Sequence, residues 1–222
     1  TENKVKVTYM IEDEIYYEEL VPYNSNHYQN IVVSNDYYKS HPNYEYIYWN
    51  TLEVLNTPLT KDTIFKATIV YKKINVTYEY EILDGSTLKT IQERVVAVCG
   101  VDKVKDLTNK LVYFKENITD KCSFIKWEHH DEIINYKENQ VFKATYNKQN
   151  LDVILEISEV IVNGIVLLDK QLITVNIPFG TIPEFNYKSL SGFKLIFDDY
   201  NNEPLYKNTL IKANLIREKD YS

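Results

Sequence analysis

Few residues of this 222-residue chain are arranged in a way that could support catalysis. Among its four histidines there is one cluster, His129-His130-Asp131. Adjacent residues on a strand or in a turn point apart, so this cluster is poorly arranged to hold one metal ion. The sequence contains neither a Gly-x-Ser-x-Gly elbow nor a glycine-rich phosphate loop. We therefore predict that the chain is not an enzyme and has no catalytic, cofactor-binding or metal-binding residues.

The charge distribution argues against a nucleic-acid partner. The net charge is −7, and the only arginines are Arg94 and Arg217, so a phosphate backbone would be repelled. The densest charged run is acidic, Glu12-Asp13-Glu14 with Glu18-Glu19. This run could bind a divalent ion or a basic partner. The alternative is a solvated loop, which is favoured because the run lacks the ordered ligand spacing of an EF-hand. No apolar run approaches about 18 residues, so we expect no membrane insertion.

Tyrosine is unusually frequent and provides the candidate binding groups. The chain has 20 tyrosines, of which 11 lie within the first 73 residues. That number exceeds what one small core could bury, and an exposed tyrosine offers a rigid ring with a hydroxyl group. The candidates are Tyr16, Tyr17, Tyr37 and Tyr38, with carbohydrate or a host protein as the partner. The alternative is that tyrosines occupy strand positions, for which aromatic residues have a high propensity.

Two cysteines, Cys99 and Cys122, flank the segment 100–121. They are expected at the end of one strand and just before another, so they could lie close together. A disulfide between them would stabilise the fold by roughly 3 kcal/mol through loop closure. The alternative is two buried free thiols, which are common in strands. Both possibilities stay open at this point.

The elements that position these residues form an internal repeat. A Lys-Ala phrase occurs three times, at spacings of 77 and 69 residues, in Thr63–Ala67, Gln140–Ala144 and Thr209–Ala213. An opening phrase recurs at 7–9, 76–78 and 153–155, and an aromatic run ends at Trp49, Trp127 and Phe197. These three anchors occur in the same order in each copy. They predict three modules with the boundaries 1–73, 74–150 and 151–222.

Alternation of apolar and polar residues predicts strands within each module. Ile74 to Ile82 and Leu151 to Ile157 alternate in this way, and Asp84-Gly85 and Asn163-Gly164 are favoured hairpin turns. Second strands are expected at 14–21, 90–98 and 165–175. The spacing of Val104, Leu107 and Leu111 predicts an amphipathic helix over 102–111. The matching segments 34–41 and 182–189 could form a turn or two, so the predicted order is strand, strand, short helix, strand, strand.

Two segments resemble a known family of bacterial surface repeats. Asn56-Thr57-Pro58-Leu59-Thr60-Lys61-Asp62-Thr63-Ile64-Phe65-Lys66-Ala67 is similar to the Asn-x-Pro-Val-Thr-x-Asp-x-x-Leu-x-Ala segment of the internalin B repeat, also called the Listeria–Bacteroides repeat. Gly192 to Phe197 is similar to its Gly-aromatic-x-x-Trp phrase, with Phe in place of Trp. The resemblance implies an α+β fold that is predominantly β, with three tandem β-grasp-like modules in an elongated array.

The resemblance also implies a non-catalytic role at a bacterial cell surface or in a secreted protein. One hypothesis is a spacer or stalk that projects another domain. The alternative is an adhesive segment that binds a host protein or glycan through the tyrosine-rich first module. The chain begins without methionine, so we expect it to be part of a longer multidomain protein.

Overall fold

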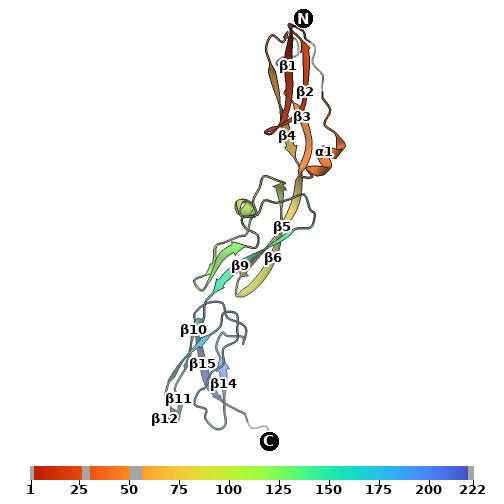
Figure 1. Ribbon diagram of the computed structural model, residues 1–222. Helices are drawn as coiled ribbons and strands as arrows, with labels where there is room; N and C mark the ends of the chain where they lie inside the picture. Colours follow the sequence, from red (N-terminus) through yellow and green to blue (C-terminus); the bar gives the residue numbers. More distant parts are fainter. Residues whose placement is uncertain (1–2, 27–30, 51–56, 220–222) are drawn as a thin grey trace. The chain divides into compact units, whose positions relative to one another are not determined.

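A computed structural model describes residues 3–26, 31–50 and 57–219 of the chain (Figure 1). The chain divides into two compact units. The first comprises Thr1–Thr77, Arg94–Asn109 and His129–Gln140, and the second comprises Tyr78–Glu93, Lys110–Glu128 and Val141–Ser222. The predicted module boundaries at 73/74 and 150/151 stay a prediction.

The predicted fold class, α+β with a short helix in every β-grasp-like module, is wrong. Of the described residues, 54% lie in strands and 6% in helices. In this part of the chain, helix is confined to α1 (Asn35–Ser40) and the 3-10 helix η2 (Val104–Lys110). The segment 182–189 contains no helix. Pro183 explains this in part, because the residue before a proline is biased towards extended conformations.

The first sheet has the strand order β2-β1-β4-β3. Strand β1 (Lys4–Ile11) pairs antiparallel with β2 (Glu14–Pro22) and parallel with β4 (Thr63–Tyr71), and β3 (Tyr44–Trp49) lies antiparallel to β4. Alternate residues of β1 face the core, where Val7 and Tyr9 are fully buried. The expected strand at 14–21 is thus confirmed. The segment that contains α1 supplies further apolar side chains that pack on this core, including Val33 and Tyr37.

The middle sheet contains two long strands, β5 (Lys73–Asp84) and β6 (Thr87–Val98). The turn that joins them comprises Gly85 and Ser86, one residue later than the predicted Asp84-Gly85 turn. Its order is β6-β5-β9-β8-β7. The shorter strands are β7 (Asn117–Thr119), β8 (Cys122–Trp127) and β9 (Val141–Lys148). The predicted helix at 102–111 is shorter than expected and is of the 3-10 type, although Val104, Leu107 and Leu111 are buried as its spacing requires.

The third sheet repeats the pairing of the first, with the order β13-β10-β15-β14. Its strands are β10 (Leu151–Ile157), β13 (Gln171–Ile177), β14 (Phe193–Phe197) and β15 (Thr209–Arg217). The alternation predicted for 151–157 is confirmed, since Leu151, Val153, Leu155 and Ile157 are all fully buried.

The expected continuous strand over 165–175 is wrong. A separate two-stranded hairpin, β11 (Val160–Val162) and β12 (Ile165–Leu168), precedes β13. Asn163 and Gly164 form its turn with φ angles of 51° and 77°, the positive values that a tight hairpin requires. The hairpin β11–β12 forms a small sheet of its own. The strand that pairs with β10 is β13, which follows this hairpin.

One cross-strand pair recurs in all three sheets and explains the Lys-Ala phrase. The aromatic residue that ends each run stands opposite the alanine, in the pairs Trp49–Ala67, Trp127–Ala144 and Phe197–Ala213. Directly opposed residues share a face of the sheet, so a small alanine leaves room for the large ring. The backbone N–H of the residue after each ring then donates to the carbonyl of the lysine, at 3.5, 2.8 and 2.9 Å.

A second shared device fixes the parallel strand pairs of the first and third sheets. The side chain of Asp62 accepts a hydrogen bond from the backbone N–H of Lys6 at 2.8 Å, and Asn208 accepts one from Asp152 at 2.9 Å. Val7 then stands opposite Thr63, as Val153 stands opposite Thr209. Asp62 and Asn208 therefore occupy equivalent positions and bind the backbone of the opening strand in the two sheets.

Candidate functional site

Two of the four candidate tyrosines use their hydroxyl groups within the fold. The backbone N–H of Ser34, which caps α1, donates to the hydroxyl oxygen of Tyr16 at 2.8 Å. The N–H of Ile47 donates to that of Tyr38, also at 2.8 Å. Both rings are half-buried against the first core. Tyr16 and Tyr38 therefore attach the segment 34–47 to the sheet, and only part of each ring faces solvent.

Tyr37 belongs to a stack of rings at the β1–β2 turn. Its ring lies 4.1 Å from that of His41 and nearly parallel to it, and His41 lies 5.1 Å from Tyr44. The hydroxyl groups of Tyr44 and Tyr71 both donate to Oε1 of Glu12, at 3.1 and 3.4 Å. Burial and the Glu12 carboxylate raise the pKa of both of these phenols. Glu12 itself has a φ of 53° in the turn.

Tyr17 is the most accessible of the four candidates. It lies on β2 opposite Tyr9, with ring centroids 6.1 Å apart, and its hydroxyl approaches Glu19 at 3.5 Å. The structure brings Tyr16 and Tyr37 together, with their rings in edge-to-face contact at 5.5 Å. Binding through these four residues stays a prediction, and in geometry Tyr17 is the best placed for it.

A more exposed pair of tyrosines lies on β3. Tyr46 and Tyr48 are 51% and 46% exposed, and their ring centroids are 6.0 Å apart. They alternate with the buried Ile47 and Trp49, so both point away from the core. The sequence contains the signal that would have identified them, because the period of two in Tyr44–Trp49 places Tyr46 and Tyr48 on one face.

The acidic run of the first module is spread along a hairpin. Glu18 accepts a hydrogen bond from Thr8 at 3.1 Å and lies 3.7 Å from the ammonium group of Lys6, whereas Glu12 binds the two phenols described above. Among the described residues, no group of three or more His, Cys, Asp or Glu side chains is placed to hold a metal ion. Neither helix in this part of the chain has the length and hydrophobicity to cross a bilayer.

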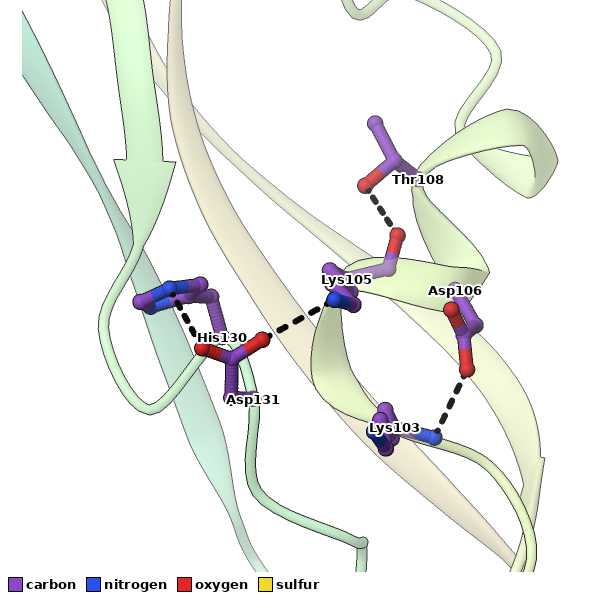
Figure 2. A network of polar contacts seen from close by, with 6 residues as sticks. All are labelled: Lys103, Lys105, Asp106, Thr108, His130 and Asp131. Carbon is purple, nitrogen blue, oxygen red and sulfur yellow. Dashed lines mark hydrogen bonds and ion pairs between the residues drawn. The ribbon is translucent and has the colours of Figure 1, made fainter.

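The histidine cluster takes part in a surface network beside η2 (Figure 2). The ring of His130 lies 3.0 Å from Asp131, whose other oxygen lies 2.9 Å from the ammonium group of Lys105. His129 instead contacts Glu132, at 3.1 Å. The hydrogen bond from Lys105 lowers the pKa of Asp131. The two imidazoles thus contact different carboxylates, and the network holds the turn 128–132 against the start of η2.

The cysteines both lie inside the protein. Cys99 and Cys122 are 0% and 1% exposed and carry free thiols in this structure. Burial raises the pKa of each thiol, which disfavours the reactive thiolate. A disulfide between them stays a prediction.

The link between β4 and β5 is a single residue, Lys72. Its backbone N–H donates to the carbonyl of Asn43, and its carbonyl accepts from the N–H of Cys99, both at 2.8 Å. A side chain on Gly100 would place its Cβ 3.3 Å from Asn43, and Gly100 has a φ of 77°. The ammonium group of Lys72 lies 5.9 Å from the ring centre of Tyr136. Both polar backbone groups of the link are therefore satisfied within the first unit.

Comparisons with known proteins give no family assignment. The sequence matches no model of a protein family and no curated protein. The resemblance to the internalin B-type repeat stays a hypothesis that rests on the residues quoted for it.

Proposed function

We propose that this chain is a non-catalytic spacer segment of a bacterial cell-surface or secreted protein. The observation that carries the proposal is the link at Lys72. A spacer must keep successive sheets in a fixed orientation, which a flexible linker between them would not do. Here β4 ends at Tyr71 and β5 begins at Lys73, so no free length of chain separates them.

The contacts around the link support this proposal in a second way. The N–H of Lys72 is bound to residue 43, from the segment before β3, and its carbonyl is bound to residue 99, from the end of β6. Rotation about the link would break these hydrogen bonds, each of which contributes about 1 kcal/mol to stability. The close approach of Gly100 to Asn43 adds steric restriction.

Rigidity of the link can be tested by NMR relaxation. We expect the amides of β1 and those of residues 73–77 and 94–98, all in the first unit, to report the same rotational diffusion. Insertion of Gly-Ser-Gly after Lys72 should make their relaxation rates diverge. The same insertion between the exposed residues Asn201 and Asn202 is the control and should leave them alike. Divergent rates already in the unaltered protein would contradict the spacer proposal.

An adhesive role is the second candidate, and the exposed pair Tyr46 and Tyr48 favours it. A screen of the whole chain against glycans and host proteins identifies candidate ligands, and a ligand supports adhesion through the first module only if its binding depends on Tyr46 and Tyr48. If a ligand is found, Tyr46→Ser with Tyr48→Ser should abolish its binding. Tyr113→Ser provides the matched control, because Tyr113 is 61% exposed and belongs to the second unit.

A further inference from the structure

The second unit contains a cavity of about 610 Å³. One wall is the β5–β6 hairpin, with Leu83, Gly85 and Ser86, and the remaining walls come from residues 198–212, which connect β14 to β15 and begin β15. The volume lies within the range of sites that bind small ligands. Nothing would obstruct a Cβ at Gly85 within 4 Å, so there is open space at the hairpin tip.

The polar groups that line the cavity are largely unused by the fold. In the described part of the chain, the side chains of Asp199, Glu203 and Lys207 make no hydrogen bond or ion pair. Asp198 uses Oδ1 to accept from Asn214 at 3.0 Å. Two carboxylates and one ammonium group therefore have their full hydrogen-bonding capacity available to a ligand.

Aromatic rings in the wall are held in fixed positions. The hydroxyl of Tyr200 donates to the carbonyl of Glu203 at 2.6 Å, and its ring packs edge-to-face on Phe197. The ring of Tyr206 packs on Phe179 with centroids 5.4 Å apart. Backbone hydrogen bonds from Gly180 to Leu205 and from Leu205 to Thr181 tie this segment down. The apolar part of the wall is therefore formed before any ligand arrives.

We propose that this cavity binds a neutral carbohydrate. Three carboxylates in the wall, at Asp198, Asp199 and Glu203, would repel an anion, and Lys207 and Lys212 would weaken binding of a cation. A sugar fits both conditions, since its hydroxyl groups can donate to carboxylates and accept from ammonium groups. Its C–H faces can pack on the tyrosine rings, Pro204 and Leu205. This inference goes beyond the spacer role and does not depend on it.

The test is an NMR titration of the whole chain with cellotriose, maltotriose and chitotriose. At least one of them should shift the methyl resonances of Leu83, Leu205 and Thr209, with a Kd on the order of 1 mM. Asp199→Asn should weaken that binding roughly tenfold, because it removes a charged acceptor. Asp169→Asn makes the same change at an exposed site outside the cavity and should leave the Kd unaltered.

A second variant tests the cavity by filling it. Ser86→Trp should remove the shifts, whereas Ser189→Trp, at an exposed position elsewhere in the second unit, should preserve them. The proposal is overturned if no sugar shifts these resonances at about 10 mM, roughly ten times the expected Kd. It is also overturned if CaCl2 or a lysine-rich peptide shifts them and the sugars do not, which would make this a cation site. Equal effects of each variant and its control would likewise reject it.

Discussion

The first and third sheets share one backbone plan but fill their cores differently. Both place the opening strand between an antiparallel partner and a parallel closing strand. In the first sheet Tyr9 is buried with its ring 5.2 Å from Trp49 and 5.3 Å from Phe65. The equivalent positions of the third sheet hold Leu155 and Ile211. The two sheets therefore share their strand register through the side-chain hydrogen bonds of Asp62 and Asn208 and the opposed aromatic–alanine pairs. Their cores, in contrast, can be packed with either aromatic or aliphatic side chains.

The covering segments differ as well. In the first unit the segment before β3 contains α1, and its tyrosines accept hydrogen bonds from backbone N–H groups. In the third sheet the corresponding segment has no helix, and apolar residues such as Phe185 and Leu190 pack on the core. A tyrosine can serve the backbone and the core at once, which a leucine or phenylalanine cannot. This gives the first sheet its high tyrosine content without requiring a binding function for every ring.

Truncation of the aromatic anchor should show the largest difference between the two sheets. Trp49→Ala should destabilise the first sheet by about 3–5 kcal/mol, because Trp49 is 8% exposed and donates to the carbonyl of Ile31. Phe197→Ala should cost less, since Phe197 is only half-buried. Amide hydrogen exchange of β1 and β10 reports each sheet separately. Equal losses in the two variants would show that the anchors are equivalent in energy despite their different burial.

Alkaline pH should affect the first sheet more than the third. Tyr37, Tyr44 and Tyr71 have a raised pKa there, chiefly through burial and then through acidic neighbours. A raised phenol pKa contributes stability that is complete below the ordinary value near 10 and is lost as pH rises through the folded-state value. We therefore expect the methyl signals of the first core to broaden at lower pH than those of the third.

Glu12→Gln tests the cause of that sensitivity. Removal of the charge should lower the pKa of Tyr44 and Tyr71 towards the ordinary value, although burial will retain part of the shift. Ultraviolet titration of tyrosinate, as a difference from the unaltered protein, measures it. Glu203→Gln is the counterpart beside Tyr200, where the phenol binds the backbone carbonyl of Glu203, and it should give a smaller shift. An unchanged titration in Glu12→Gln would rule out the carboxylate as a cause.

The paired backbone-binding side chains should be equivalent. Asp62→Ala and Asn208→Ala each leave one strand N–H without its acceptor, so each should destabilise its own sheet by about 1 kcal/mol. Asp62→Asn and Asn208→Asp keep the accepting oxygen and should be nearly neutral. Denaturant melts followed by hydrogen exchange of β1 and β10 would measure both pairs. If Asp62→Asn and Asn208→Asp destabilise their sheets as much as the alanine variants do, the charge of the side chain rather than its hydrogen bond would be the important property.

Acid should produce the smallest effect, and in the third sheet. Glu156 lies 2.9 Å from Lys170, and this hydrogen bond lowers the pKa of Glu156. A lowered carboxyl pKa gives stability that is present above the unfolded-state value and is lost as pH falls through the folded-state value. The equivalent position of the first sheet is Met10. Lys170→Met should return the NMR-measured pKa of Glu156 towards its ordinary value, with little change in stability because Lys170 is exposed to solvent.

The sequence identified the strands better than it identified what lies between them. Alternation located β10 because Leu151, Val153, Leu155 and Ile157 are buried, whereas Ile154 between them is exposed. The repeated phrases located the aromatic and alanine anchors, although they did not show that these residues stand opposite each other. The helices were misjudged because six or seven residues are too few for periodicity to separate an α-helix, a 3-10 helix and an extended cover. The second strand of the third module was misplaced because an Asn-Gly sequence predicts a hairpin turn but not the length of the two strands that the turn joins.

The candidate residues illustrate a similar limit. Composition indicated an excess of tyrosine, yet exposure depends on which face of a strand a residue occupies. For Tyr46 and Tyr48 the exposed face can be predicted from the alternation with their apolar neighbours. The hydrogen bonds that distant backbone groups make to the hydroxyls of Tyr16 and Tyr38 cannot be predicted in this way. The cavity of the second unit could not be foreseen either, because its walls join residues 83–86 to residues more than a hundred positions later.

The opposed aromatic and alanine residues also define how this repeat can diverge. Their combined volume is constrained, whereas their individual identities are not, and the Phe197–Ala213 pair already departs from the tryptophan of the other copies. A larger residue at Ala144 should be accepted only together with a smaller one at Trp127. Further copies of such a module would therefore be recognised by compensating changes at two positions 17 to 18 residues apart in the first two sheets and 16 apart in the third, even where no phrase of the sequence is shared.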